Sequence, residues 1–244
     1  MLSVREFHRP KSGYRESEYE DAFSIDAAGG KFAVADGATE SSFSNVWAKA
    51  LVSTFVENPP PMDMNDRQSV KNLLDESRKK WYGGIDWTSL PWFQKNKAVL
   101  GSYSTFLGLQ IDSPENPRRY RCITIGDSCL FHLSGPKMES FPFSDYRDLN
   151  YTPRLMWSGH GYPIGLSKDV EPPGLEVKYG KLKEGDTLIL ATDAISKWML
   201  QNKFNKPWEQ ILENADNWDS YIGGLISSGA MKNDDITAIF ISVS

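Results

Sequence analysis

Short apolar runs in this chain end directly at a carboxylate, and this pattern constrains the fold more than any other feature. The run Phe32–Ala35 ends at Asp36 and Gly37, and the run Thr187–Thr192 ends at Asp193. Such runs, bounded by turn residues, are typical of buried strands. Because Gly37 permits a tight turn and leaves its carbonyl uncovered, side-chain and main-chain oxygens can meet there. The alternative is an ordinary turn, since Asp-Gly is a common turn dipeptide.

Two further acidic pairs lie beside predicted strands. Glu20-Asp21 precedes the strand 22–26, and Asp234-Asp235 precedes the strand 236–243. Carboxylates at strand ends can be brought to one edge of a sheet, where their repulsion is costly unless cations neutralise it. Oxygen ligands suit Mg²⁺ or Mn²⁺ and disfavour zinc or copper. The pattern therefore predicts a site for more than one metal ion, whereas the three histidines lack metal-ligand spacing.

The order of the predicted elements indicates one domain, residues 1–244, built of strands and helices. Helical periodicity predicts helices at 43–55, with Ser41, Ser42 and Ser44 as possible caps, and at 69–82, 194–200, 208–214 and 218–227. Apolar and alternating runs predict strands at 22–26, 31–35, 103–111, 119–125, 129–133, 175–179, 187–191 and 236–243. Consecutive strands with short links favour antiparallel sheets over a βαβ series.

Two segments lack periodicity. Phe141–Pro173 carries five prolines and several aromatic residues, and a stretch this long without regular structure predicts a flap beside a cleft that contributes to substrate choice. Disorder is the alternative. Residues 83–94 carry Trp87 and Trp92, which we expect to cover the core beneath a loop rather than to form a partner site.

Composition excludes several classes of function. With 27 Lys and Arg against 32 Asp and Glu, the chain lacks the basic face of a nucleic-acid-binding protein. No apolar segment approaches the ~18 residues that span a membrane. The polar segment Met1–Glu20 is not a secretory signal, so we expect a cytoplasmic protein with two reduced cysteines, Cys122 and Cys129.

No motif for a nucleophile or a nucleotide is present: the chain has no GxGxxG, GxxxxGK[ST], HExxH or GxSxG. A covalent mechanism therefore has no support, whereas a water activated by two metal ions needs no such motif. A phosphate would also require a cation, preferably a forked guanidinium. Arg15, six residues before Asp21, is the best-placed candidate, and the alternative is a solvated N-terminal arginine.

The ordered motifs resemble the type-2C, metal-dependent protein serine/threonine phosphatases, the PPM family, and are most similar to its compact bacterial members. The resemblance runs from Arg15 to the C-terminus. It implies an α+β fold, a four-layer α-β-β-α sandwich with two antiparallel sheets flanked by helices. The matching segments are Glu20–Phe23, Ala33–Thr39, Gly101–Thr105, Ile125–Ser128, Gly185–Asp193 and Asp234–Thr237.

The resemblance also implies a role for each candidate site residue. Asp36 would bridge two metal ions, Mn²⁺ or Mg²⁺, and one ion would bind the Gly37 carbonyl. Arg15 would bind the phosphate. Metal ligation by the remaining carboxylates is implied for Asp193 and Asp234, for the acidic pair Glu20 and Asp21, and, at a third and weaker site, for Asp127.

Three departures from the family pattern matter. Ala38 stands where relatives carry a histidine that acts as general acid, and Ala194 replaces the glycine after Asp193. Lys197 stands where many relatives carry another aspartate, which puts the third metal ion in doubt. The ligands for two ions all remain.

The implied activity is hydrolysis of phosphoserine or phosphothreonine in proteins, opposing a cognate serine/threonine kinase in signal transduction. One alternative is a catalytically weak or inactive module that binds phosphoproteins, suggested by the departures at Ala38, Ala194 and Lys197. Another is a metal-dependent hydrolase of a small phosphorylated metabolite.

Overall fold

The computed structural model describes residues 1–61, 66–112, 118–149, 153–159 and 174–244. Its two large sheets have five strands each, and neighbouring strands within each sheet are antiparallel. The first sheet has the order β1 (Leu2–Arg9), β12 (Ile236–Val243), β11 (Thr187–Ala191), β7 (Cys129–Ser134) and β8 (Lys137–Phe141). The second has the order β10 (Glu176–Leu182), β6 (Arg118–Ile125), β5 (Phe106–Ile111), β3 (Lys31–Ala35) and β2 (Ala22–Asp26).

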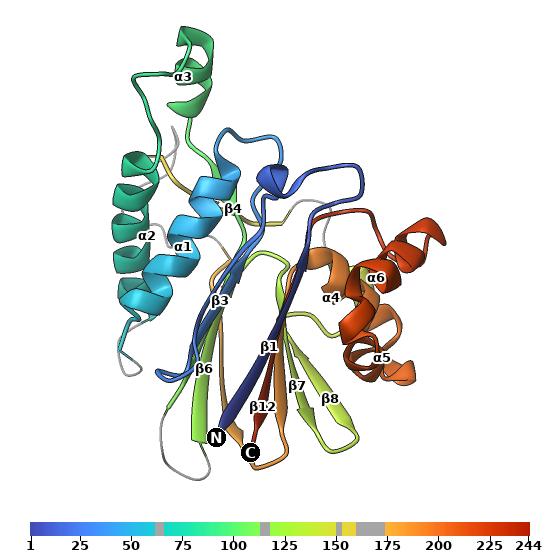
Figure 1. The fold of residues 1–244 in the computed structure, drawn as a ribbon. Coiled ribbons are helices and arrows are strands. Elements are labelled where there is room, and N and C mark those ends of the chain that lie inside the picture. The colour runs from blue at the N-terminus through green and yellow to red at the C-terminus, as the bar shows by residue number, and fades with distance from the viewer. Residues whose placement is uncertain (62–65, 113–117, 150–152, 160–173) are drawn as a thin grey trace.

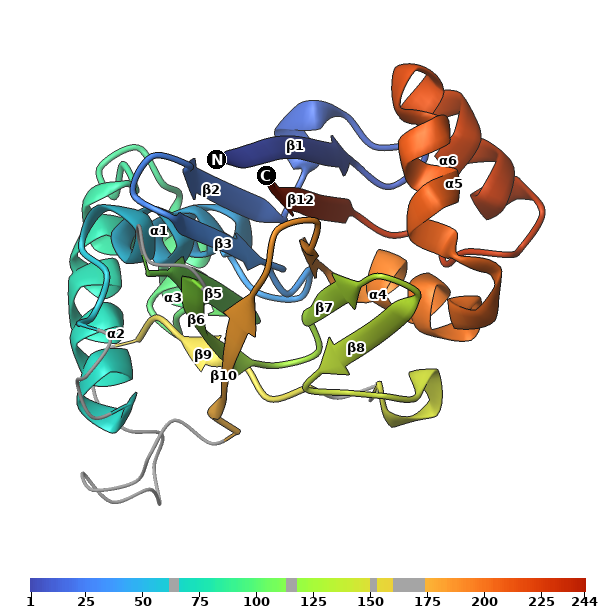
Figure 2. The same ribbon diagram turned by 90° about the horizontal axis from the view of Figure 1, so that it is seen from below.

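Helices lie outside both sheets, and Figure 2 shows the resulting four layers from one end. The second sheet is covered by α1 (Ser44–Glu57) and α2 (Asp66–Gly83). The first sheet is covered by α4 (Asp193–Gln201), α5 (Pro207–Glu213) and α6 (Trp218–Ser227). The described residues also include a short helix, α3 (Trp92–Ala98), and a two-stranded ribbon of β4 (Tyr103–Ser104) and β9 (Met156–Trp157). The α-β-β-α sandwich expected from the sequence is confirmed.

Three apolar cores separate the four layers. The position of β3 between two of these cores explains why its sequence is continuously apolar. Phe32 and Val34 are buried between the two sheets, whereas Ala33 and Ala35 are buried beneath α1 and α2. Side chains alternate between the faces of a strand, so a strand covered on both faces needs apolar residues at every position.

The structure corrects several expectations. Strands β1 and β8 were not predicted, and the strand expected at 103–111 is interrupted at Thr105, where β4 leaves the large sheet. No serine caps α1: its N-cap is Phe43, in the left-handed conformation and without a side-chain cap bond. Trp92 does not cover the core, because 76% of its surface is exposed.

Of the predicted flap, Phe141–Pro173, residues 150–152 and 160–173 lie outside the described residues. The remainder holds β9 and a short 3-10 turn at Tyr146–Asp148. In the described part of the chain, no helix has both the length and the apolar character needed to cross a membrane.

Candidate functional site

The predicted ligands adjoin the ends of β3, β6 and β11 and the beginnings of β2 and β12. These strand ends lie away from both chain termini, at the upper end of the sandwich in Figure 1. In the second sheet, Ala22 pairs with Ala35, so Asp21 and Asp36 occupy the next pair of positions on β2 and β3. In the first sheet, the amide of Thr192 donates to the carbonyl of Thr237 at 3.0 Å, which places Asp193 beside the start of β12. The two sheets therefore bring their carboxylates to a shared edge, as the sequence pattern predicted.

The segment through Asp36 and Gly37 is held in an extended form by the residues before β5. The amide of Thr105 donates to the Asp36 carbonyl at 2.9 Å, and the Asp36 amide donates to Thr105 Oγ1 at 3.1 Å. Gly37 pairs with Ser104 in an isolated bridge. The alternative of a turn at Asp-Gly is therefore wrong, because the turn begins only at Ala38.

Space, rather than backbone freedom, requires glycine at position 37. A Cβ atom there would lie 2.6 Å from the Glu20 carbonyl oxygen and 3.0 Å from Ser44. Both distances are shorter than ordinary van der Waals contact. The backbone of the acidic pair thus packs directly against Gly37, which ties the beginning of β2 to the end of β3.

Asp21 is buried, and its two carboxylate oxygens have different surroundings. One oxygen, Oδ2, accepts hydrogen bonds from the hydroxyls of Thr237 at 2.7 Å and Thr192 at 2.9 Å. The other, Oδ1, is buried and has no hydrogen-bond partner among the described residues. Burial raises the pKa of Asp21 well above its ordinary value, and the charge of Asp235 raises it further.

The other carboxylates repel one another. Burial raises the pKa of Asp36, and the charges of Asp21 and Asp193 add to this effect. Burial and Asp193 raise the pKa of Asp127 to about 7, and Asp127 Oδ1 is a second buried oxygen without a partner in the described part of the chain. Unpartnered buried carboxylates are costly, so this edge of the sandwich favours a bound cation.

A lysine contacts two of the predicted ligands. Lys232 Nζ lies 3.1 Å from Asp193 Oδ2 and 2.5 Å from Asp234 Oδ2. Burial alone would lower the pKa of Lys232, but the two carboxylates raise it above its ordinary value. About half of the lysine side chain is exposed, so the ammonium group lies at the rim of the site.

Asp234 and Asp235 have separate tasks. Asp235 turns away from Lys232 and accepts the backbone amides of Lys11 at 2.8 Å and Glu20 at 2.7 Å. It therefore holds the loop that leads into β2. The Glu20 carboxylate in turn accepts hydrogen bonds from Ser44 Oγ at 2.7 Å and from Thr39 and Lys11.

Arg15 lies at the start of a 3-10 turn, Glu16–Glu18, and its side chain is exposed. Within the described ranges, no ion pair joins its guanidinium to the carboxylate cluster. Its role in binding phosphate stays a prediction. The same holds for the ligand roles of all the predicted metal ligands: Glu20, Asp21, Asp36, Gly37, Asp127, Asp193 and Asp234.

The donor set fits a hard divalent cation, although no ion is part of the structure. In the described residues, no group of three or more His, Cys, Asp or Glu side chains is arranged closely enough to hold a metal ion. The chemistry nevertheless matches, because the converging groups are carboxylates and two of their oxygens are buried without partners.

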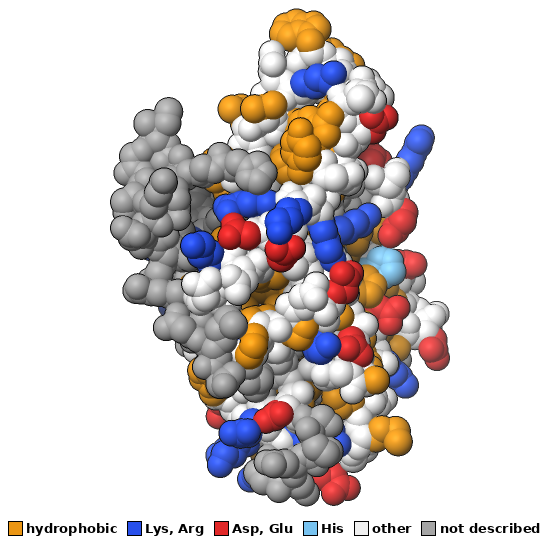
Figure 3. Space-filling model, turned by 90° about the vertical axis from the view of Figure 1, so that its left-hand side faces the viewer, with side chains coloured by type: hydrophobic (Ala, Val, Ile, Leu, Met, Phe, Trp, Pro, Cys, Tyr) orange, Lys and Arg blue, Asp and Glu red, His pale blue; other side chains and the backbone are white. Residues whose placement is uncertain are grey.

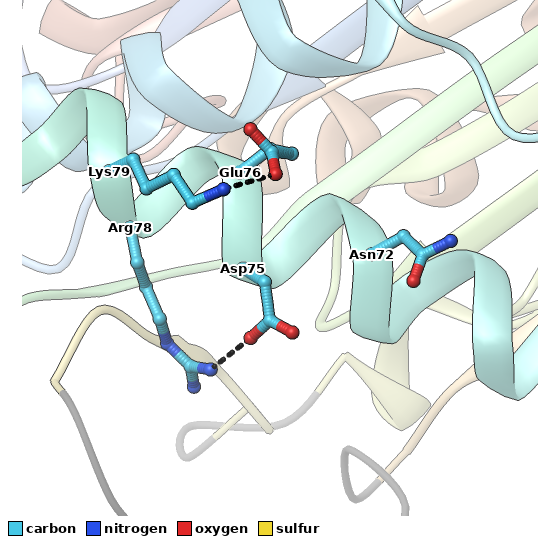
Figure 4. A pocket seen from close by; sticks show the side chains of 5 residues that line it. All are labelled: Asn72, Asp75, Glu76, Arg78 and Lys79. Atoms are coloured by element: carbon cyan, nitrogen blue, oxygen red, sulfur yellow. Dashed lines mark hydrogen bonds and ion pairs between the residues drawn. The ribbon is translucent and has the colours of Figure 1, made fainter.

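One surface cavity is unrelated to this cluster of carboxylates. It has a volume of about 410 Å³ and lies along α2 (Figure 4). Its charged side chains are paired with one another: Arg78 with Asp75 at 3.2 Å, and Lys79 with Glu76 at 2.6 Å. None of the predicted site residues lines it.

Sequence reasoning missed the groups that position the carboxylates. Thr192 directly precedes Asp193, and Thr237 follows Asp234 by three residues. This closeness in sequence to predicted ligands was the signal that could have identified the two threonines. No pattern distinguished Asp235 from Asp234. Nothing in the sequence indicated that Lys232 would pair with two ligands.

Comparison with solved structures places the fold. The chain matches the catalytic domain of the serine/threonine phosphatase PstP, solved with two manganese ions, at 16% identity and a TM-score of 0.61, with all of both chains covered. It matches PppA from Pseudomonas aeruginosa at 18% identity and 0.58, covering 100% of this chain and 98% of that one. It matches the PPM Ser-Thr phosphatase MsPP from Mycobacterium smegmatis at 15% identity and 0.57, covering 99% and 98%. No family model and no curated protein matches the chain in sequence. The chain therefore has the fold of the bacterial PPM phosphatases over its full length.

Proposed function

We propose that this chain hydrolyses phosphoserine or phosphothreonine in proteins, using Mn²⁺ or Mg²⁺ bound at the shared edge of the two sheets. The residues that would hold the ions are Asp36, the Gly37 carbonyl, the acidic pair Glu20 and Asp21, and Asp193 with Asp234. The single observation that carries this proposal is the pair of buried, unpartnered carboxylate oxygens on Asp21 and Asp127. The solved relative PstP, which carries two manganese ions, supports the choice of cation.

The chain's own residues would orient the reacting groups. Two ions bound there would lower the pKa of a water molecule and stabilise its attack on phosphorus. Thr192 and Thr237 fix the Asp21 carboxylate, and Thr105 fixes the backbone at Asp36. Ala38 has no group that can donate a proton, so a proton for the leaving group would come from another source. Arg15 would hold the phosphate.

The partner would be a phosphorylated protein, with a kinase of matching specificity opposing the reaction in the cytoplasm. PstP and MsPP, which are serine/threonine phosphatases, support this substrate class. In this proposal, Asp127 would bind a third ion only weakly.

Phosphate release from a phosphothreonine peptide, measured with Mn²⁺, tests the proposal. Activity should disappear on chelation and in Asp36→Asn, which keeps the size of the side chain but removes its charge. Asp26→Asn is the matched control, because Asp26 lies at the opposite end of β2 and pairs with Lys31 at 3.4 Å. Persistent activity in Asp36→Asn would overturn the assignment.

The alternative of an inactive phosphoprotein-binding module, suggested by the departures from the family pattern, gains one structural observation, the pairing of Lys232 with Asp193 and Asp234. It predicts peptide binding without phosphate release at any Mn²⁺ concentration. A panel that adds sugar and nucleotide phosphates to the phosphopeptides would identify a metabolite hydrolase.

A further inference from the structure

Helix α3 exposes apolar side chains on a part of the molecule that stands clear of the sandwich. Figure 1 shows α3 projecting beyond the end of the sandwich where the carboxylates lie. Ala98 is the only buried residue of the helix. The exposed fractions are 76% for Trp92, 56% for Phe93, 70% for Val99 and 68% for Leu100. We call these four residues the α3 face.

The four side chains share one side of the helix. Val99 follows Trp92 by seven residues and Leu100 follows Phe93 by seven, which is about two helical turns in each case. Val99 and Leu100 follow the last residue of α3. If the projection of about 100° per residue is continued through them, the α3 face covers an arc of about 120°, the exposed Asn96 lies within this arc, and the buried Ala98 lies opposite to it. The rings of Trp92 and Phe93 contact each other edge to face, with centroids 6.2 Å apart.

The two charged residues of helix α3 are both lysines. On the same helical projection, Lys95 and Lys97 lie on either side of the apolar arc. They are the only charged residues between Trp87 and Ile111, in a chain whose net charge is −5. Figure 3 shows apolar side chains together with basic ones at the end of the molecule that carries α3, and acidic side chains lie nearby. An apolar arc between two lysines is complementary to a segment that alternates apolar and acidic residues.

The α3 face is continuous with the candidate site. Leu100 precedes Tyr103 by three residues, a span of at most about 10 Å of extended chain. The carbonyl of Tyr103 accepts the amide of Ala38 at 2.9 Å, two residues after Asp36. The helix adds about 10 Å, so about six or seven extended residues of a peptide would reach from the site to the far end of the α3 face.

From this position and charge we infer that the α3 face binds an acidic, apolar segment of the protein substrate, several residues away from its phosphorylated side chain. The inference rests on the proposed function and names a determinant of its substrate choice. A partner that bound only at the α3 face would gain no affinity from the closeness of this face to the candidate site. A substrate that occupies both surfaces gains from being held at two points.

Matched phosphothreonine peptides test this inference with the Mn²⁺-loaded protein. One set carries an arm of alternating leucine and glutamate placed four to eight residues before or after the phosphothreonine, and the other set carries a glycine-serine arm of equal length. The wild-type protein should show a KM about tenfold lower for the better acidic arm. Trp92→Ala/Leu100→Ala should lose this preference, while kcat and the hydrolysis of p-nitrophenyl phosphate stay unchanged.

Two further variants sharpen the result. Phe204→Ala removes a ring that is 89% exposed outside the α3 face, and it should keep the preference. Lys95→Glu/Lys97→Glu should instead prefer an arm of alternating leucine and lysine. An unchanged preference in Trp92→Ala/Leu100→Ala would overturn the inference.

Fluorescence anisotropy of the same labelled peptides separates this inference from the proposed function. If no phosphoester is hydrolysed but the acidic arm binds wild type at least tenfold more tightly than the double variant, the proposed function fails and the α3 face stands as a binding surface. Equal binding overturns the inference. Two other results would also overturn the inference if the wild-type protein shows no peptide preference. One is binding to phosphatidylglycerol vesicles that the double variant loses, and the other is a dimer in size-exclusion chromatography that the double variant does not form.

Discussion

Replacing Asp235 with alanine tests how the acidic pair before β2 is held in place. The Asp235 carboxylate is 4% exposed and accepts two backbone amides, from Lys11 and Glu20, at 2.8 and 2.7 Å. A hydrogen bond to a charged group contributes about 1.5–3 kcal/mol, so the two bonds together contribute at least about 3 kcal/mol. Burial raises the pKa of Asp235, which means that removing the charge recovers part of this stability.

We therefore expect Asp235→Ala to lower the free energy of unfolding by about 2 kcal/mol, and Asp235→Asn, which keeps one acceptor oxygen, by about 1 kcal/mol. Urea denaturation measures both values. Because the loop into β2 loosens, the affinity for Mn²⁺ in calorimetric titration should also fall in both variants.

The neighbouring residue provides the control. Asp234 contacts Lys232 and accepts only the amide of the adjacent Asp235, at 3.0 Å, which the asparagine oxygen can still accept. Asp234→Asn should therefore weaken Mn²⁺ binding while leaving the unfolding free energy within about 0.5 kcal/mol of wild type. If Asp234→Asn destabilised the chain more than Asp235→Ala, the division of tasks between the two carboxylates would be refuted.

Three other outcomes are expected from the packing and the titrating groups. Gly37→Ala should lower the free energy of unfolding by about 1–3 kcal/mol and reduce phosphate release, because its Cβ would overlap the Glu20 carbonyl. Thermal melts measure the change in stability. Gly224→Ala, whose Cβ meets nothing within 4 Å, is the matched control. Burial alone would raise the pKa of Asp186, but hydrogen bonds, one of them with His132 at 2.9 Å, lower it. A carboxyl group whose pKa is lower in the folded state than in the unfolded state stabilises the fold at pH values above its unfolded pKa, and this stabilisation is lost as the pH falls through the folded pKa. Asp186→Asn lacks this group, so its free energy of unfolding, measured by denaturation between pH 6 and pH 2, should fall less steeply with pH than that of wild type. Burial raises the pKa of Cys129 to about 12, so the native protein should not react with a thiol-specific disulfide reagent at pH 8, whereas the urea-unfolded protein should react at once.

Much of the fold could be predicted because the central strands are buried on both faces. Runs such as Phe32–Ala35 and Thr187–Ala191 carry this burial in their composition, and the carboxylates at their ends mark one edge. β1 escaped prediction for the opposite reason. It lies at the edge of its sheet, and Phe7 is its only buried residue, so its identity depends on pairing with β12. That residues 1–244 form one domain stays a prediction.

Side-chain direction is what the sequence could not supply at the candidate site. Asp234 and Asp235 are adjacent and chemically identical, yet one faces an ammonium group and the other holds two backbone amides. Trp92 shows the same limit in a helix, because its exposure depends on how far α3 stands from the rest of the chain. Both outcomes are set by tertiary contacts rather than by local pattern.

The division of the carboxylates between two sheets has a thermodynamic consequence. Asp21 and Asp36 belong to one sheet, and Asp193 and Asp234 adjoin the other, so an ion held by both pairs would join the two halves of the sandwich. Separating the sheets would then require releasing the ion. Folding and metal binding would share one equilibrium, in which free metal at a hundred times its dissociation constant adds about 2.7 kcal/mol to the free energy of unfolding. The resistance of this protein to unfolding would thus vary with the divalent cations around it.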